Sequence, residues 1–319
     1  MTGNLERWRG DELLPANELA DAQKLLQDSL SPNTRRAYEQ SWRAFGEWCA
    51  ERRVSPLPAA PETLVAYITY MNKAGKKPAT ISRALAAISV THGLKGHESP
   101  RKSQLVQRAW RGVCRTRGLA PTRKAPVTDK LLDQVVGTIP TNTLLGLRNR
   151  ALILFGFAAA LRRSELVAVK VEHLTLEEKG CRLWIPRSKT DQSGHGAEVY
   201  VPRWDDALCP VKALEEWLEY ARIRSGPVFR AVGRWEHVGE EPLDDRMVAL
   251  VVQKAVKDAG FDPRAFGGHS LRAGLATSAA EKGTPADAIM KHTRHKSHAM
   301  VFQYIRRALG YDTSPAKLR

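Results

Sequence analysis

The chain has 319 residues, and its 50 Lys and Arg outnumber its 34 Asp and Glu, giving a net charge of +16 and a pI near 9.9. Its 43% hydrophobic content suits a folded core, but the longest apolar run, residues 151–161, is too short for a transmembrane helix. The excess of positive charge predicts a polyanionic partner, with nucleic acid favoured over a membrane surface and over charge that serves only solubility.

The length of the chain and its cysteines indicate the number of domains and the cellular compartment. A chain of 319 residues favours two domains. The four cysteines form no CxxC pair, and the N-terminus shows no apolar leader, so we expect reduced thiols and a cytoplasmic protein. They are Cys49, Cys114, Cys181 and Cys209.

An N-terminal extension, residues 1–30, precedes a predicted helical domain over residues 31–117. Ser31 and Pro32 predict an N-cap and the first helical position. Aromatic residues then recur at spacings of four, three and three, which places them on one helix face as core. They are Tyr38, Trp42, Phe45 and Trp48. Further helices are expected from Pro61, from Pro78 and through a segment with Leu105 and Val113 inward.

Positive charge is concentrated around the end of this domain. Residues 73–124 contain 13 Lys and Arg against one acid, and residues 118–126 have the composition of a basic interdomain linker. This stripe predicts contacts with a phosphate backbone. The candidate contact residues are Arg35, Arg36, Lys76, Lys77, Arg83 and Lys124.

A second domain is predicted over residues 127–310, followed by a tail, residues 311–319. A buried helix covers the apolar run at residues 151–161. Two β-like runs, residues 181–186 and 197–202, predict a hairpin, and helices resume after it. The expected fold is mainly α: an N-terminal helical DNA-binding domain and a mostly helical α+β domain with a small antiparallel sheet.

Four separated segments of this second domain carry reactive side chains. Each alone has a structural interpretation, such as an exposed arginine, a loop lysine, a capping histidine or an amphipathic tyrosine. Their reactive residues are Arg162 and Glu165 in LRRSEL, Lys189 in RSKTD, His269 and Arg272 in GGHSLRAG, and His295 and Tyr304 in HKSHAMVFQYIR.

Together these side chains supply a nucleophile and its proton acceptor. A tyrosine hydroxyl has an ordinary pKa of about 10 and needs help to attack a phosphate at neutral pH. Tyr304 is the candidate nucleophile, and His269 can accept the proton of its hydroxyl. Glu165 is expected to orient His269.

The same set supplies groups for the phosphate and for the leaving oxygen. Arg162 and Arg272 can hold the two non-bridging oxygens through charge-assisted bonds, and His295 can donate to one of them. Lys189, on the hairpin loop, is the candidate acid for the leaving 5′ oxygen. No metal is required, because the arginines stabilise the developing charge.

The order Arg, Lys, His-x-x-Arg, His, Tyr resembles that of the tyrosine recombinase (phage integrase) family, and the two-domain layout is similar to that of Cre-like members. ALRRSEL matches the Arg-x-x-Glu box, HSLR matches the His-x-x-Arg box, and His295 lies nine residues before Tyr304, as in the family. SPNTRRAYEQSWRAFGEWC looks like the first helix of the core-binding domain. The resemblance extends over residues 31–307.

The resemblance implies conservative site-specific recombination of double-stranded DNA. Four identical subunits would bind two DNA sites, cleave them to 3′-phosphotyrosyl links and pass through a Holliday junction. The resemblance implies no metal, ATP, membrane or small-molecule substrate. The segment after Tyr304 would pack on a neighbouring subunit.

Three other interpretations remain open at this stage. His292, His295 and His298 have a spacing that invites a zinc site, although neither Cys nor Asp completes it. A type IB topoisomerase uses similar chemistry without strand exchange. A catalytically silent DNA-binding accessory protein would carry the same charge stripe.

Overall fold

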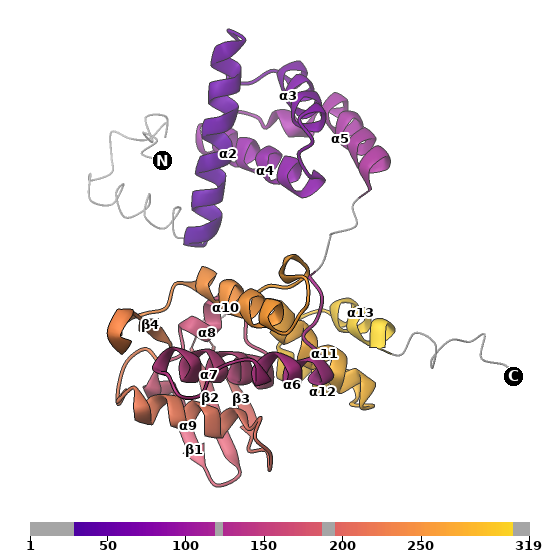
Figure 1. Cartoon of the computed structure of the whole chain (residues 1–319). Coiled ribbons are helices and arrows are strands. Elements are labelled where there is room, and N and C mark those ends of the chain that lie inside the picture. The colour runs from indigo at the N-terminus through magenta and orange to yellow at the C-terminus, as the bar shows by residue number, and fades with distance from the viewer. Residues whose placement is uncertain (1–28, 119–123, 187–194, 309–319) are drawn as a thin grey trace, which may run out of the picture. The chain divides into compact units, whose positions relative to one another are not determined.

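A computed structural model of the chain describes residues 29–118, 124–186 and 195–308. The chain divides into two compact units, Met1–Thr122 and Arg123–Arg319, and both consist mainly of helices (Figure 1). The predicted fold class, mainly α with a small antiparallel sheet, is confirmed. None of the helices in the described ranges has the length and apolar character that crossing a membrane requires.

The first unit is built from helices that begin where the sequence predicts. The Ser31 hydroxyl accepts a hydrogen bond from the Thr34 amide at 3.3 Å and caps the first helix, while Pro61 and Pro78 begin the next two. The elements are α2 (Pro32–Glu51), α3 (Pro61–Lys73), α4 (Pro78–Leu94), the short 3-10 helix η1 (Pro100–Lys102) and α5 (Gln104–Arg117).

Aromatic side chains form the centre of this unit. The ring centroids of Phe45 and Tyr67 lie 4.9 Å apart, and those of Trp48 and Tyr67 lie 5.1 Å apart. Phe45 and Trp48 are buried and the half-buried Trp42 packs against them, so the predicted core face of α2 is confirmed at these three positions, whereas Tyr38 is half-buried and lies outside the cluster. In α5 the expected inward position is wrong by one residue, because Val106 is buried and Leu105 is exposed.

The second unit combines helices with two small antiparallel sheets. The predicted hairpin is confirmed as β2 and β3, and an additional strand, β1, pairs with the other edge of β2. Lys189 and the rest of residues 187–194 lie outside the described residues. The helices are α6 (Asp129–Gly137), α7 (Leu144–Ala158), α8 (Arg163–Val167), α9 (Pro210–Tyr220), α10 (Asp245–Asp258), α11 (Ser270–Glu281), α12 (Ala286–Thr293) and α13 (His298–Ala308). The strands are β1 (Leu174–Glu177), β2 (Gly180–Ile185), β3 (Ala197–Pro202), β4 (Arg230–Val232) and β5 (Val238–Pro242), and 3-10 turns lie at η2 (Val171–His173), η3 (Arg234–Glu236) and η4 (Pro263–Ala265).

The buried helix predicted for residues 151–161 is α7, the central helix of this unit, which ends at Ala158, three residues before the end of the apolar run. Its side chains from Ala151 to Ala158 are all buried, because α9 and α11 pack against it. The chain leaves α7 through Ala160, which has a positive φ of 47°, and reaches Arg162 two residues later. A largely buried helix therefore leads directly to the first predicted catalytic arginine.

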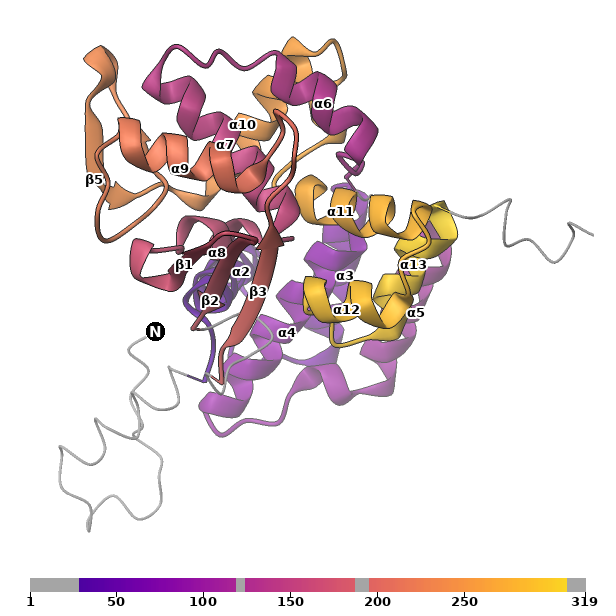
Figure 2. The ribbon, with the colours of Figure 1, turned by 90° about the horizontal axis from the view of Figure 1, so that it is seen from below.

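Helices α11, α12 and α13 lie side by side, and the remaining described site residues lie on them or next to their ends (Figure 2). Helix α11 also lies close to the start of the unit, where the Val127 amide donates to the Ser270 carbonyl oxygen at 2.9 Å. Gly274 permits this approach, since a Cβ atom there would lie 1.8 Å from the Val127 carbonyl oxygen. The backbone at Val127 thus fixes the helix that bears Arg272.

Substituting Gly274→Ala should lower the free energy of unfolding by about 2 kcal/mol or more, because backbone rather than a flexible side chain must move to admit the methyl group. Chemical denaturation checks this value. Gly137→Ala is the matched control, since a Cβ atom there meets nothing within 4 Å. Equal stability of the two variants would contradict the close approach of α11.

Candidate active site

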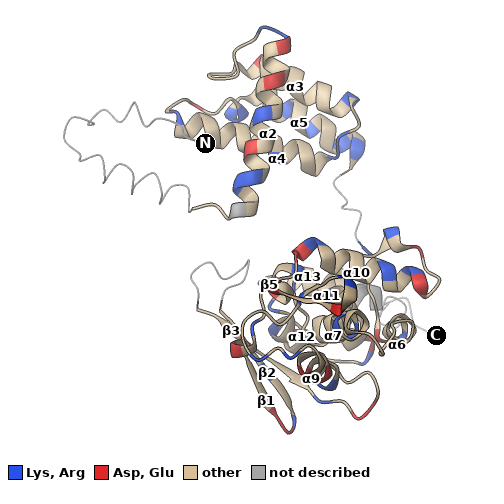
Figure 3. Cartoon of the chain, turned by 60° about the vertical axis from the view of Figure 1, so that its left-hand side comes forward, with Lys and Arg blue, Asp and Glu red and all other residues tan. Residues whose placement is uncertain are grey.

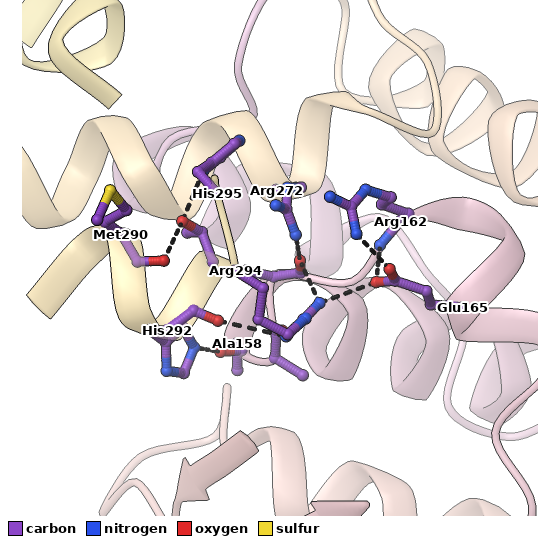
Figure 4. A network of polar contacts seen from close by, with 11 residues as sticks. Ala158, Arg162, Glu165, Arg272, Met290, His292, Arg294 and His295 are labelled. Carbon is purple, nitrogen blue, oxygen red and sulfur yellow. Dashed lines mark hydrogen bonds and ion pairs between the residues drawn. The ribbon is translucent and has the colours of Figure 1, made fainter. Parts of the chain in front are cut away.

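Four segments of the second unit bring the predicted catalytic residues together. Arg162 precedes α8, His269 precedes α11, Arg272 lies within α11, and His295 lies between α12 and α13. Tyr304, on α13, lies close to them, and Figure 4 shows how the arginines and His295 are arranged. Of the predicted set, only Lys189 lies outside the described residues.

The Tyr304 hydroxyl and His269 are hydrogen-bonding partners. The distance from the His269 Nε2 atom to the Tyr304 Oη atom is 3.2 Å. Tyr304 is only 8% exposed, whereas His269 is exposed. Both line a cleft of about 250 Å³, together with Lys124, Pro126, Ala273, Thr277, Met300 and Gln303. The His269 imidazole therefore lies in the cleft, within hydrogen-bonding distance of the tyrosine hydroxyl, where it could accept the proton of that hydroxyl.

Arg272 is a buried guanidinium with unused donors. The side chain is 1% exposed, and Nη1 donates to the Ala160 carbonyl oxygen at 2.7 Å. Among the described residues, Nε and Nη2 have no hydrogen-bond partner. Burial, together with the charges of Arg162 and Arg294, lowers the pKa of Arg272 to about 9, so the group stays charged at neutral pH. Buried unpaired donors are costly, and an anion would satisfy both of them.

Arg162 is held by Glu165 at the beginning of α8. Its Nη1 atom lies 2.5 Å from Glu165 Oε1, and its backbone amide donates to Glu165 Oε2 at 3.0 Å. Burial raises the pKa of Glu165, but Arg294 and Arg162 outweigh burial and leave that pKa below its ordinary value. We predicted that Glu165 orients His269. Glu165 instead binds the guanidinium groups of Arg162 and Arg294 and the Arg162 amide, so its carboxylate is placed to orient these arginine side chains.

His295 is a buried, neutral imidazole beside the tyrosine. It is 6% exposed, its Nδ1 atom lies 2.7 Å from the Thr293 hydroxyl, and its ring centroid is 5.8 Å from that of Tyr304. Burial, followed by the charges of Arg272 and Arg162, lowers the pKa of His295 to about 3. Because Thr293 occupies Nδ1, Nε2 is the ring nitrogen that remains for a substrate oxygen.

The sequence prediction did not include Arg294 and His292, which belong to the same network. The Arg294 guanidinium lies 2.8 Å from Glu165 Oε2, and His292 Nε2 donates to the Ala158 carbonyl oxygen at 2.7 Å. The sequence shows only that both residues lie between the His-x-x-Arg box and Tyr304. That position does not indicate that their side chains point into the site.

The three clustered histidines do not form a metal site with one another. His292 contacts Ala158, His295 contacts Thr293, and His298 lies 3.2 Å from Asp287 Oδ1. Within residues 29–118, 124–186 and 195–308, no group of three or more His, Cys, Asp or Glu side chains is placed to hold a metal ion. The geometry thus gives the zinc interpretation no support.

The candidate DNA contacts lie on the surface of their respective units. Arg36, Lys76, Lys77, Arg83 and Lys124 are exposed, and Arg35 is half-buried. Figure 3 shows basic residues on α2 and α5 of the first unit, whereas the sequence of α4 contains only one Lys or Arg, Arg83. In the second unit, Lys124 donates to the Arg264 carbonyl oxygen at 2.5 Å and lines the cleft beside Tyr304. These positions are accessible to a nucleic acid, and their role remains a prediction.

Comparison with known families defines the class. The model of the phage integrase family matches residues 126–309, and the model of the phage integrase N-terminal SAM-like domain matches residues 23–94. This chain belongs to the phage integrase family, and it is an enzyme of the tyrosine recombinase type.

Individual relatives agree with that assignment. The chain is 41% identical to an integrase/recombinase XerD homologue of Selenomonas ruminantium, over 89% of this chain and 84% of that protein. It is 25% identical to the recombinase Cre of Escherichia phage P1, over 83% and 81% of the two chains. A lambda integrase dimer bound to a COC′ core site shares the fold, with a TM-score of 0.61 at 16% identity over 94% of this chain and 79% of that one.

Proposed function

We propose that this chain is a site-specific DNA recombinase that cuts and rejoins strands through a 3′-phosphotyrosyl intermediate and a Holliday junction. One observation carries the proposal: the Tyr304 hydroxyl lies 3.2 Å from His269, beside a buried Arg272 with two unpaired nitrogen donors among the described residues. A phosphodiester would bring the anionic oxygens that these donors need.

In the cleavage step, the Tyr304 oxygen forms a bond to phosphorus while the bond from phosphorus to the 5′ oxygen breaks. His269 takes the tyrosine proton, and Lys189 gives a proton to the leaving 5′ oxygen. Arg162 and Arg272 bind the non-bridging oxygens, on which negative charge develops in the transition state. The reverse step lets a 5′ hydroxyl of the partner duplex attack the phosphotyrosine and release Tyr304.

This scheme uses neither a metal ion nor ATP. The positive charge that a metal would supply comes from the two guanidiniums, which stay protonated throughout. The energy of the broken phosphodiester is retained in the phosphotyrosyl bond, so rejoining needs no external source.

The partners follow from the same proposal. The substrate is double-stranded DNA with a specific site, and we propose a homotetramer on two sites, in the cytoplasm where that DNA lies. A lambda integrase tetramer bound to a Holliday junction has the same fold, with a TM-score of 0.57 at 17% identity. We propose that residues 31–117 form the DNA-binding domain and residues 127–310 the catalytic domain. The predicted linker, residues 118–126, is shorter than expected, because Lys124 and Ala125 are hydrogen-bonded to the second unit.

A nicked DNA duplex tests the proposal. A nick beside the scissile phosphate lets the short 5′ fragment diffuse away after cleavage, so a covalent protein–DNA adduct accumulates. We expect an adduct that survives denaturation and whose peptide mass identifies Tyr304 as the modified residue. Binding without any adduct would favour the silent accessory protein over a recombinase.

A plasmid carrying two sites separates recombination from topoisomerase activity. A recombinase yields products with exchanged flanks, and a type IB topoisomerase yields only relaxed plasmid. We expect exchanged flanks. Relaxation alone, on several pairs of candidate sites, would favour the topoisomerase.

The Lys189→Ala variant should cleave an ordinary phosphodiester at least about 10²-fold more slowly, because an unprotonated 5′ oxygen is a poor leaving group. A substrate with sulfur at the 5′ bridging position should restore the rate, since a thiolate leaves without an acid. Single-turnover cleavage of both substrates checks this. An equal defect on the sulfur substrate, with DNA binding intact, would assign Lys189 another role.

DNA affinity should fall steeply with salt. If the six predicted phosphate contacts each displace a counterion, log K should decrease with log[salt] with a slope of about −5. Arg83→Gln should reduce the magnitude of that slope by about 0.9, whereas Lys212→Gln, on α9, should leave it unchanged. Filter binding or fluorescence anisotropy over a salt series measures the slope, and a flat line would contradict the role of the charge stripe.

A further inference from the structure

Arg294 occupies a backbone position that favours glycine. It follows α12 with φ 55° and ψ 42°, the left-handed region that a residue with a side chain rarely adopts. The turn connects α12 to His295. The contacts made by the Arg294 side chain should therefore explain why a large residue occupies this position.

The Arg294 guanidinium is inside the site network, and its side chain is 10% exposed. Nη2 lies 2.8 Å from Glu165 Oε2 and 3.3 Å from the Ala160 carbonyl oxygen. Nη1 donates to the carbonyl oxygens of Ala159 and His292 at 3.4 and 3.3 Å. One side chain thus ties together the end of α7, helix α8 and the turn before His295.

Glu165 connects Arg294 to Arg162. Its Oε2 atom binds Arg294 and the Arg162 amide, and its Oε1 atom binds the Arg162 guanidinium (Figure 4). Without Arg294, Oε2 would keep only the Arg162 amide as a partner, so the carboxylate would be held less firmly. The carboxylate could then rotate so that both of its oxygens bind the Arg162 guanidinium and draw it away from a phosphate.

We propose that Arg294 is a positioning residue, which clamps Glu165 and thereby fixes the direction in which Arg162 presents its guanidinium to the scissile phosphate. The proposal rests on the proposed function, because it assigns Arg162 to the phosphate. It explains why a strained arginine occupies a position suited to glycine: the side chain contact outweighs the backbone cost.

The Arg294→Gly variant relieves the backbone strain and removes only the side chain. Under saturating nicked DNA we expect its single-turnover cleavage rate to fall by about 10- to 100-fold, with DNA affinity unchanged. Arg222→Gly is the matched control, because Arg222 has the same left-handed backbone (φ 54°) after α9 but is exposed. Its rate should equal that of the unchanged protein.

A purely structural role for Arg294 predicts a different pattern in double variants. If Arg294 acts through Glu165, then adding Arg294→Gly to Glu165→Gln should cause little further loss, whereas independent effects would multiply. Multiplied losses, or an Arg294→Gly rate equal to that of the unchanged protein, would overturn the proposal. Thermal melting shows whether each variant is folded.

Two further measurements keep the result interpretable. Should Arg294→Gly fail to fold, Arg294→Lys is the substitute variant. Lysine retains the charge but cannot bind Glu165 and the carbonyl oxygens at once, so its cleavage rate should also fall. An unchanged cleavage rate would overturn the proposal. The unchanged protein serves as the reference for the proposed function. Its failure to form any adduct would defeat that function, whereas a failure confined to the Arg294 variants concerns this inference alone.

Discussion

Replacing Tyr304 with phenylalanine should abolish the covalent protein–DNA adduct, lowering cleavage by more than about 10⁴-fold. The substitution removes the oxygen atom that we propose as the nucleophile and keeps the ring that packs beside His295. The lost hydrogen bond to His269 contributes about 1 kcal/mol, so the variant should fold and bind DNA normally. Denaturing gel analysis of the nicked-duplex reaction measures the adduct.

Tyr220→Phe is the matched control for this experiment. Tyr220 ends α9 and is 66% exposed, so removing its hydroxyl should leave adduct formation unchanged. A Tyr304→Phe protein that still forms the adduct at the normal rate would remove Tyr304 from the mechanism. The modified peptide would then identify the true nucleophile.

Replacing Arg272 with methionine should separate activity from stability. Cleavage should fall by about 10³-fold or more, because the variant loses the buried guanidinium that would bind a non-bridging oxygen. The melting temperature should stay the same or rise, since the change removes a buried charge with two unpaired donors and fills the space with an apolar side chain of similar length. Ala160 keeps a contact from Arg294 at 3.3 Å.

Arg148→Met controls for the loss of any buried arginine. Arg148, on α7, is 3% exposed and its donors are used by Asn149 and by the Arg230 carbonyl oxygen. We expect this variant to lose stability and keep its cleavage rate, the opposite of Arg272→Met. A large fall in the melting temperature of Arg272→Met would show that this arginine holds the fold rather than a phosphate.

Local sequence signals predicted most of the helical fold. Proline and serine at helix starts, as at Ser31 and Pro61, act over a few residues, so they can be recognised in the sequence alone. Strand β1 and the β4–β5 pair were not predicted. Strand β4 and strand β5 show no apolar alternation, and the alternation in β1 covers only the four residues of LTLE, which is too short to distinguish a strand.

The sequence named the candidate reactive residues that the structure brings together, and Glu165 as a supporting acid, but it missed Arg294 and His292. Arg272, His269 and Tyr304 could be identified because their chemical types and order match one reaction. Arg294 could not, because its role depends on a left-handed turn that directs the side chain to Glu165 across 129 residues of sequence. This turn is stabilised by contacts between residues far apart in the sequence, so no local sequence pattern predicts it.

The backbone contact between Val127 and α11 has a practical consequence for protein engineering. Lys124, Ala125 and Val127 are each bonded to the segment that carries η4 and the start of α11, so the residues entering the second unit belong to its interior framework. A chimera that exchanges the first unit for another should place its junction before Lys124. A junction a few residues later would remove hydrogen bonds that hold α11, the helix that bears Arg272, so we expect such a hybrid to be inactive.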